Sequence, residues 1–310
     1  MTEEKAYETA GIPSGSADYS ITEGCLVLEG GAFRGLYTQG VLDALMLNGI
    51  NMRCVIGVSA GALAGVNYVS GQIGRSARIN IGFRRDGRYI GLQALARSRS
   101  ILDVGFLTDD RGILEPFDRK RFYSAERRFE TVATDLESGE AVCFKKGECR
   151  DIMLAVKASA TMPFISPPVV IDGIPYLDGG CSCAIPFRRA MDSGFRKIVV
   201  VRTREPGFRN ESRRNIAALG FYRRYPRFAE KLANCRITYN SECIELEELA
   251  AEGRVFMISP SERTDVRRIE GDLGKLAALY RLGMNDCISV LRELCGYLEI
   301  EYPVRGSRMP

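Results

Sequence analysis

The sequence predicts an α/β fold whose central sheet is mainly parallel. Between residues 25 and 69 the pattern runs strand, loop, helix, strand, turn, helix, and short apolar runs stand where buried strands would lie. A further apolar run, Lys197–Val201, follows a helical stretch in the same way. Parallel strands need crossovers between them, so this alternation favours a parallel sheet covered by helices. The length of 310 residues allows one large domain, or one domain with an extension.

The first two strand–helix units are the clearest part of the pattern. Cys25–Leu28 is a short apolar strand, and the glycine-rich loop Glu29–Gly35 follows it. Apolar residues at helical spacing predict a helix over Leu36–Leu47, which an Asn-Gly pair ends. Arg53–Ile56 is the second strand, and Leu63–Val69 suits the next helix.

Later elements continue this alternation. Phe129–Thr134 and Ala141–Phe144 are predicted strands, and Asp151–Ala158 is a predicted helix. Val169–Leu177 reads as a hairpin that turns at an Asp-Gly pair, and Pro186 begins another helix. The portion from Gly74 to about Phe122 is less regular and fits either a flap over the site or solvated helices. Its arginines are Arg84, Arg85, Arg88, Arg97 and Arg99.

The chain divides by composition into three parts. Residues 1–22 read as a loose lead-in, 23–203 as the α/β domain, and 204–310 as a mainly helical extension or cap. Within the last part, Arg254–Ser259 has the pattern of a late strand, and Gly274–Leu298 is periodic enough to predict one long helix. The pattern leaves open whether this part is a separate domain or packs on the first.

Charge and composition exclude several classes of protein. The apolar share of 45% and the charged share of 26% are typical of a folded globular protein. A net charge of +4 is too small to predict nucleic-acid binding, although it permits contact with an anionic membrane surface. No apolar run has the length of a transmembrane helix, and the acidic start lacks a signal-peptide pattern. We therefore expect a cytoplasmic protein, with peripheral contact at the inner membrane surface allowed.

The ten cysteines and the absence of histidine limit the chemistry further. No C-x-x-C pair occurs, so reduced and mostly buried thiols are expected, with Cys181 and Cys183 the closest pair. A chain without histidine cannot form a Ser-His-Asp triad, a Cys-His dyad or a histidine-bearing zinc site. A nucleophilic serine in this chain would need Asp, Glu, Lys or Tyr as its base.

Ser59 is the candidate nucleophile. It stands at the centre of Gly57–Gly61, which has the G-x-S-x-G pattern and lies between an apolar strand and a helix. The flanking Gly57 and Gly61 leave room for the strained turn that exposes a serine hydroxyl above a sheet.

The loop Gly30–Gly35 is the candidate oxyanion hole. Small residues between a strand and a helix N-terminus expose backbone N–H groups, and those of Gly31 and Ala32 are the favoured donors. A dinucleotide-binding turn fits less well, because Ala32 replaces the middle glycine of that motif and no acidic residue ends the second strand. A plain structural turn remains open.

Asp178 is the candidate base. It follows a predicted strand, and Gly179 and Gly180 after it let its carboxylate approach another loop. A simple Asp-Gly turn is the alternative. Because an aspartate near its reference pKa of about 3.9 is a weak base, the proposed role requires partial desolvation.

Together these motifs resemble the patatin-like phospholipases. That family has a glycine-rich oxyanion loop, a G-x-S-x-G elbow and a later Asp-Gly-Gly or Asp-Gly-Ala motif, and it uses a Ser-Asp dyad without histidine. The resemblance assigns Ser59 as nucleophile, Asp178 as proton acceptor and Gly30–Gly35 as oxyanion loop, within a three-layer fold. Two more segments resemble the family, Ala133–Gly139 and Ala158–Pro163. The match runs over about residues 24–203.

The sequence also departs from the family pattern. Glu29 stands where many relatives have Asp, and Ala32 where they have a third glycine; its oxyanion role requires ordinary backbone angles. Arg34 matches a basic position thought to face the lipid phosphate in related enzymes, with a solvent-facing arginine as the alternative. Ile258–Ser261 and Leu276–Tyr280 resemble the extension of a bacterial subgroup.

The resemblance implies a serine acyl hydrolase that acts on lipid esters, phospholipids or lysophospholipids, without a metal or organic cofactor. Two alternatives use the same residues: a lipid-binding regulatory protein that has lost turnover, and a transacylase that prefers another acceptor to water. The sequence does not set the oligomeric state.

Overall fold

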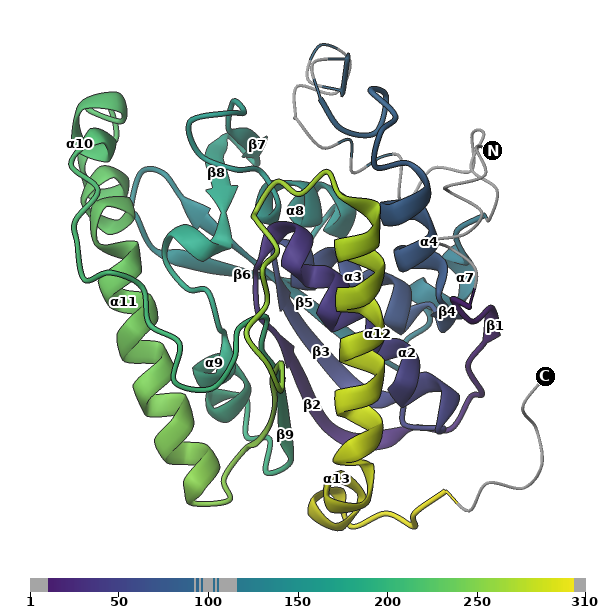
Figure 1. Ribbon diagram of the computed structural model, residues 1–310. Coiled ribbons are helices and arrows are strands. Elements are labelled where there is room, and N and C mark those ends of the chain that lie inside the picture. Colours follow the sequence, from purple (N-terminus) through teal and green to yellow (C-terminus); the bar gives the residue numbers. More distant parts are fainter. Residues whose placement is uncertain are drawn as a thin grey trace.

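We describe residues 11–91, 93, 94, 96, 103, 105 and 116–303 of a computed structural model of the chain (Figure 1). Arg97 and Arg99 of the arginine-rich portion lie outside these residues. In the described part, eight strands form one sheet in the order β10-β9-β2-β3-β5-β8-β7, with β6 also paired to β5. Their bounds are β2 Thr22–Leu28, β3 Met52–Val58, β5 Arg128–Asp135, β6 Ala141–Lys145, β7 Val169–Ile171, β8 Ile174–Asp178, β9 Ile198–Val201 and β10 Phe256–Ile258.

The sheet is parallel along five neighbouring strands and antiparallel at one side. β10, β9, β2, β3 and β5 pair in parallel, whereas β6, β8 and β7 join the sheet by antiparallel pairing. A separate antiparallel pair consists of β1 Gly15–Ser16 and β4 Gln72–Ile73. The prediction of an α/β fold with a mainly parallel sheet is therefore confirmed.

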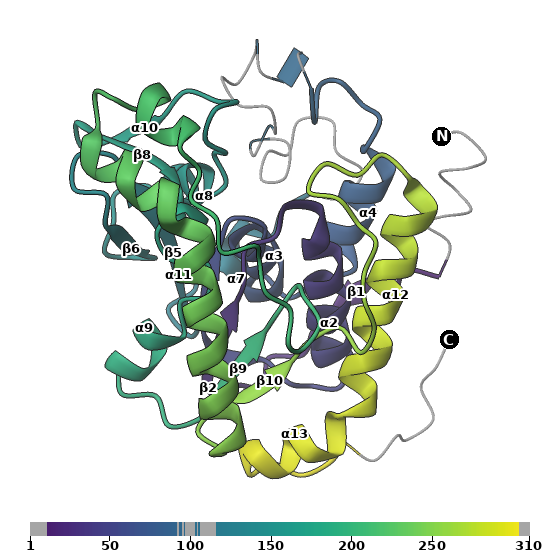
Figure 2. The same ribbon diagram turned by 60° about the vertical axis from the view of Figure 1, so that its left-hand side comes forward.

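Helices cover both faces of the sheet, which makes three layers (Figures 1 and 2). The first side has α2 Gly35–Leu47, α3 Ala60–Val69, α4 Arg75–Gly82, α7 Arg119–Tyr123, α8 Ile152–Ser159, α12 Leu273–Ser289 and α13 Leu291–Leu298. The second side has α9 Phe187–Asp192 and α11 Pro226–Ala251, and α10 Ala217–Phe221 lies beside the start of α11. Two short 3-10 turns are η1 Ala32–Arg34 and η2 Gly179–Cys181.

The alternation of side chains along β2 explains why both faces are covered. Leu26 and Leu28 join the buried cluster on the side of α2 and α12, whereas Cys25 and Val27 join the cluster on the side of α11. Because successive side chains of a strand point to opposite faces, an apolar run such as this one needs helices on both sides.

The residues after 203 contribute to these same layers. β10 extends the sheet beside β9, α11 covers one face, and α12 packs along α2 on the other. A Cβ atom added at Gly283 of α12 would lie 2.1 Å from the Tyr37 carbonyl oxygen, so the two helices approach very closely there. Tyr280 also donates to buried Asp43 at 2.7 Å. The division of the chain at residue 203 stays a prediction.

The predicted single helix over 274–298 is instead two helices. α12 ends at Ser289, whose hydroxyl donates to the Asp286 carbonyl at 2.7 Å, and α13 begins at Leu291. A serine bond of this kind competes with the helix ladder and helps to end the helix. In the described part of the chain, no helix combines the length and apolar character needed to cross a bilayer.

Candidate active site

Ser59 occupies a strained turn between β3 and α3. Its backbone has φ 54° and ψ −121°, a region that residues with a side chain rarely adopt. Gly61 permits the turn, because a Cβ atom there would lie 2.5 Å from the Leu28 carbonyl oxygen. Gly57 is similarly confined, because a Cβ atom added there would lie 2.7 Å from the Ala62 backbone. This is the geometry of a nucleophile elbow.

Ser59 and Asp178 are in direct contact. The Ser59 hydroxyl donates to Asp178 Oδ2 at 2.7 Å, although 119 positions separate the two residues. Strand pairing brings them together: Val58 pairs with Val132 of β5, and the next β5 residue, Ala133, pairs with Asp178. The two side chains are 8% and 9% exposed, so the hydrogen bond lies in a largely water-free site.

The environment of Asp178 makes it a stronger base than an ordinary aspartate. Burial raises the pKa of its carboxyl group, and the hydrogen bonds from Ser59 and the Gly180 N–H offset part of that rise. The Gly180 bond is 2.8 Å long and fixes Oδ1, which leaves Oδ2 for the serine. Arg268 adds a smaller charge effect that lowers the pKa.

The stretch after α8 supports both members of the pair. The Ser59 N–H donates to Ser159 Oγ at 2.9 Å, and Ser159 in turn donates to the Val132 carbonyl at 2.6 Å. Two residues later, the Thr161 carbonyl accepts the Asp178 N–H at 2.9 Å. The sequence marked this stretch only by resemblance, because serines and threonines give no local signal of such long-range bonds.

Two backbone N–H groups of the glycine-rich loop have no partner in the described residues. The N–H of Gly30 donates to the Ala184 carbonyl, and that of Phe33 donates to the Arg268 carbonyl. The N–H groups of Gly31 and Ala32 have no protein acceptor in the described residues. Gly30 lies against the serine, since a Cβ atom there would be 3.3 Å from Ser59 Cβ. Gly35 is packed more closely still, because a Cβ atom added there would lie 2.8 Å from Ala60 Cβ.

The backbone of Ala32 differs from the expectation of ordinary angles. Its φ is 50°, in the left-handed region that glycine adopts without strain. Glycine, which many relatives have at this position, would adopt this φ without strain. Ala32 adopts it at some cost in backbone strain. The Ala32 N–H remains without a protein acceptor in the described residues, so the favoured donors keep their hydrogen-bonding capacity.

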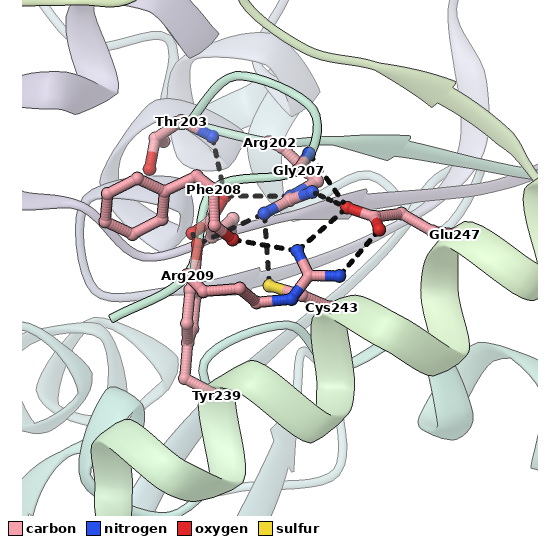
Figure 3. A network of polar contacts seen from close by, with 9 residues as sticks. Arg202, Thr203, Gly207, Phe208, Arg209, Tyr239, Cys243 and Glu247 are labelled. Atoms are coloured by element: carbon pink, nitrogen blue, oxygen red, sulfur yellow. Dashed lines mark hydrogen bonds and ion pairs between the residues drawn. The ribbon is translucent and has the colours of Figure 1, made fainter. Parts of the chain in front are cut away.

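Glu29 ties the start of this loop to the C-terminal part of the chain. Its buried carboxylate accepts the Thr203 N–H at 2.6 Å and the Tyr239 hydroxyl at 2.7 Å. Fully buried Arg202 lies 4.0 Å from Glu29 and also reaches Glu247 at 3.2 Å. Figure 3 shows how this network extends to Arg209, which forms an ion pair with Glu247 of α11.

Arg34 is buried, which excludes the solvent-facing alternative. It is 8% exposed, and its Nε has no hydrogen-bond partner among the described residues. Burial, together with the positive charges of Arg204 and Arg268, lowers the pKa of its guanidinium to about 10, against a rise caused by Glu29. Three arginines with one carboxylate make this side of the loop electropositive.

One of the cysteines, Cys243, joins the Glu29 network, where its Sγ accepts from Arg202 at 3.1 Å. All ten are free thiols, including Cys181 and Cys183. Burial raises the pKa of both of these thiols, so they stay protonated at neutral pH. In the described residues, no group of three or more acidic or cysteine side chains could hold a metal ion.

The model of the patatin-like phospholipase family matches residues 26–191. The match covers more than half of the sequence, and the chain belongs to this family. The resemblance inferred from the motifs is therefore confirmed. A second family model, a domain of unknown function (DUF6363), matches residues 225–299.

Related proteins share only part of their length with this chain. The uncharacterized protein YjjU of Escherichia coli is 28% identical over 194 residues, which are 57% of this chain and 51% of that protein. The uncharacterized NTE family protein Rv1063c of Mycobacterium tuberculosis is 28% identical over 170 residues, 52% and 43% of the two chains. This chain thus spans about half the length of these curated relatives. The crystal structure of VipD from Legionella pneumophila aligns with a TM-score of 0.44 and 14% identity, over 92% of this chain and 69% of that one.

Proposed function

We propose that this protein is a serine acyl hydrolase that cleaves acyl esters of lipids, with Ser59 as nucleophile and Asp178 as base. The observation that carries the proposal is the 2.7 Å bond from a strained elbow serine to a buried carboxylate, in a chain without histidine. Membership of the patatin-like phospholipase family supports the lipid substrate class. The cytoplasm, expected from the sequence, is the proposed place of action.

In this mechanism Asp178 accepts and returns one proton in each of two half-reactions. Ser59 Oγ attacks the acyl carbonyl while Asp178 Oδ2 accepts the hydroxyl proton. The developing oxyanion meets the N–H groups of Gly31 and Ala32, which have no protein acceptor in the described residues. As the C–O bond breaks, the proton passes from Asp178 to the leaving alcohol. Asp178 then takes a proton from water while the hydroxide attacks the acyl carbon. As the bond from that carbon to Ser59 Oγ breaks, the proton passes from Asp178 to Ser59 Oγ, which releases the fatty acid and restores the serine hydroxyl and the carboxylate.

The arginines beside the loop favour an anionic lipid over a neutral one. Buried Arg34 has an unpartnered Nε, and two further positive charges act on it. A phosphate close to the ester would satisfy this buried donor, whereas a triglyceride has no group that could. We therefore propose phospholipids or lysophospholipids as substrates.

Labelling with a fluorophosphonate probe, followed by a panel of lipid substrates, tests the proposal. We expect wild type to label, and Ser59→Ala to lose labelling and to lower ester hydrolysis about 10³-fold or more. Ser70→Ala is a suitable control, because Ser70 is a buried serine at the other end of α3. Labelling that persists in Ser59→Ala, or hydrolysis that remains at the wild-type rate, contradicts the assignment.

The same experiment separates the two alternatives. A protein that binds lipid without turnover leaves the probe unreacted although its fold is intact. A transacylase labels, but transfers the acyl group to an added alcohol or lipid in preference to water. Product analysis by mass spectrometry distinguishes these outcomes.

A further inference from the structure

Helix α10 and the β7–β8 hairpin lie toward the same end of the molecule (Figures 1 and 2), and both carry exposed apolar side chains. On α10 and the residue before it, Phe221 is 63% exposed and Ile216 is 74% exposed. The ring of Phe164 lies 5.2 Å from that of Phe221, so the loop after α8 and α10 present one continuous aromatic surface. Ile165 and, on β7, Val170 are exposed in the same region of the fold. Apolar residues in such a cluster mark an interaction surface.

A run of arginines borders this apolar surface. Residues 213–227 contain five arginines and no acidic residue, although the whole chain has a net charge of only +4. Arg214 is paired with Glu230, whereas Arg223 and Arg227 are exposed and have no ion-pair partner in the described residues. We call these surroundings the docking face; it comprises Phe164, Ile165, Val170, Arg213, Ile216, Phe221, Arg223, Arg224 and Arg227.

We propose that the docking face binds the surface of an anionic lipid bilayer. Exposed aromatic and aliphatic side chains insert into the interfacial region, while neighbouring arginines contact lipid phosphates. A second copy of the chain is a poor occupant, because a symmetric contact would place two arginine-rich, acid-free segments against each other. The inference goes beyond the proposed function, since binding does not depend on turnover.

The docking face is joined to the candidate active site by the residues beneath it. The Phe164 N–H donates to the Tyr222 hydroxyl at 2.8 Å, and buried Tyr222 packs in one apolar cluster with Leu177 and Cys181. Asp178 lies between those two residues in the sequence. A bilayer held on this face would therefore lie against the elements that position Asp178.

Co-sedimentation of the full chain with vesicles tests the proposal. We expect binding to vesicles of equal phosphatidylglycerol and phosphatidylcholine, much weaker binding to pure phosphatidylcholine, and a loss of binding as salt rises. The double variant Arg223→Gln with Arg224→Gln should weaken binding about twenty-five-fold at low salt, because each arginine contributes about five-fold. Ile216→Ser with Phe221→Ser should weaken it about ten-fold or more.

Matched controls and an inactive variant keep the result independent of catalysis. Ile244→Ser removes an exposed isoleucine (49%) farther along α11, and Arg281→Glu changes an exposed arginine on α12; both should bind vesicles as wild type does. Ser59→Ala should also bind normally. The proposal is overturned if both vesicle types bind equally, if neither binds, or if the docking-face variants match the controls. Loss of a dimer in Phe221→Ser, measured by sedimentation velocity without lipid, would identify a second copy as the occupant and overturn it as well.

Discussion

Asp178 is held where its negative charge is disfavoured. Burial raises the pKa of its carboxyl group, so the folded protein binds this proton more tightly than the unfolded chain does. The ionised form needed by a base therefore reduces the stability of the fold at neutral pH. Such a conflict between stability and activity is common at catalytic groups.

Replacing Asp178 with asparagine should separate the two effects. Asp178→Asn removes the proposed base and should abolish ester hydrolysis, while the free energy of unfolding at pH 7 should equal or exceed that of wild type. Since the folded-state pKa is raised, the stability of wild type should increase relative to the variant as the pH falls from neutral through that pKa. Urea unfolding at several pH values measures this difference. A variant that is clearly less stable at neutral pH would contradict it.

Ser159 should act as a positioning residue for the elbow. Its hydroxyl is the acceptor for the Ser59 N–H, so Ser159→Ala leaves a buried donor without a partner. We expect kcat to fall about ten-fold or more with little change in KM, and the rate of fluorophosphonate labelling to fall in parallel. Equal kcat in the variant and wild type would show that the turn at Ser59 keeps its geometry without this hydrogen bond. Circular dichroism checks that the variant is folded.

At the scale of secondary-structure elements, the contact between α2 and α12 is the tightest helix pair. Gly40 of α2 faces α12, where an added Cβ would lie 2.1 Å from the Tyr280 carbonyl oxygen, and Gly283 faces α2 at the same distance from Tyr37. Two helices reach such short separations only where small residues line the contact. These glycines set how closely the C-terminal part can lie against the helix that follows the glycine-rich loop.

Gly283→Ala should therefore destabilise the fold by about 3 kcal/mol, since the new methyl group meets backbone atoms that cannot move aside. Gly296→Ala provides the matched control, because a Cβ atom at Gly296 in α13 meets nothing within 4 Å. That substitution should stabilise the protein by about 0.5–1 kcal/mol through helix propensity. Thermal unfolding of both variants gives the comparison, and a similar melting temperature for the two would refute the close contact.

At the scale of the whole molecule, local patterns predicted the elements, and long-range contacts required the structure. The elbow at Ser59 and the hairpin before Asp178 were visible because their residue types follow from the local backbone. By contrast, the bond from Tyr239 to Glu29 spans 210 positions, and nothing in the sequence around either residue marks it. The left-handed φ of Ala32 was also unpredictable, because tertiary contacts impose it on a residue that does not favour it.

A chain cut after residue 203 should fail to fold on its own. The cut removes β10, α11 and α12, and with them side chains that complete the buried clusters on both faces of the sheet. The remaining strands would expose apolar surface to water. We expect the fragment to aggregate, or to bind 8-anilinonaphthalene-1-sulfonate and lack sharp thermal unfolding. A fragment that unfolds cooperatively would instead support an independent domain over 23–203.

The candidate site depends on the register of the antiparallel pairing between β8 and β5. Ala133 pairs with Asp178 and Thr134 with Leu177, so the distance between serine and carboxylate is set by which residues of two strands stand opposite each other. Side chains alternate along a strand, and a shift of one position would turn Asp178 to the other face and bring an apolar leucine toward Ser59. One residue inserted in the turn at Asp172 and Gly173, if it shifted β8 by one position, would thus break the contact between Ser59 and Asp178 without replacing either residue. The chemistry of this site is encoded in strand alignment as much as in the two side chains.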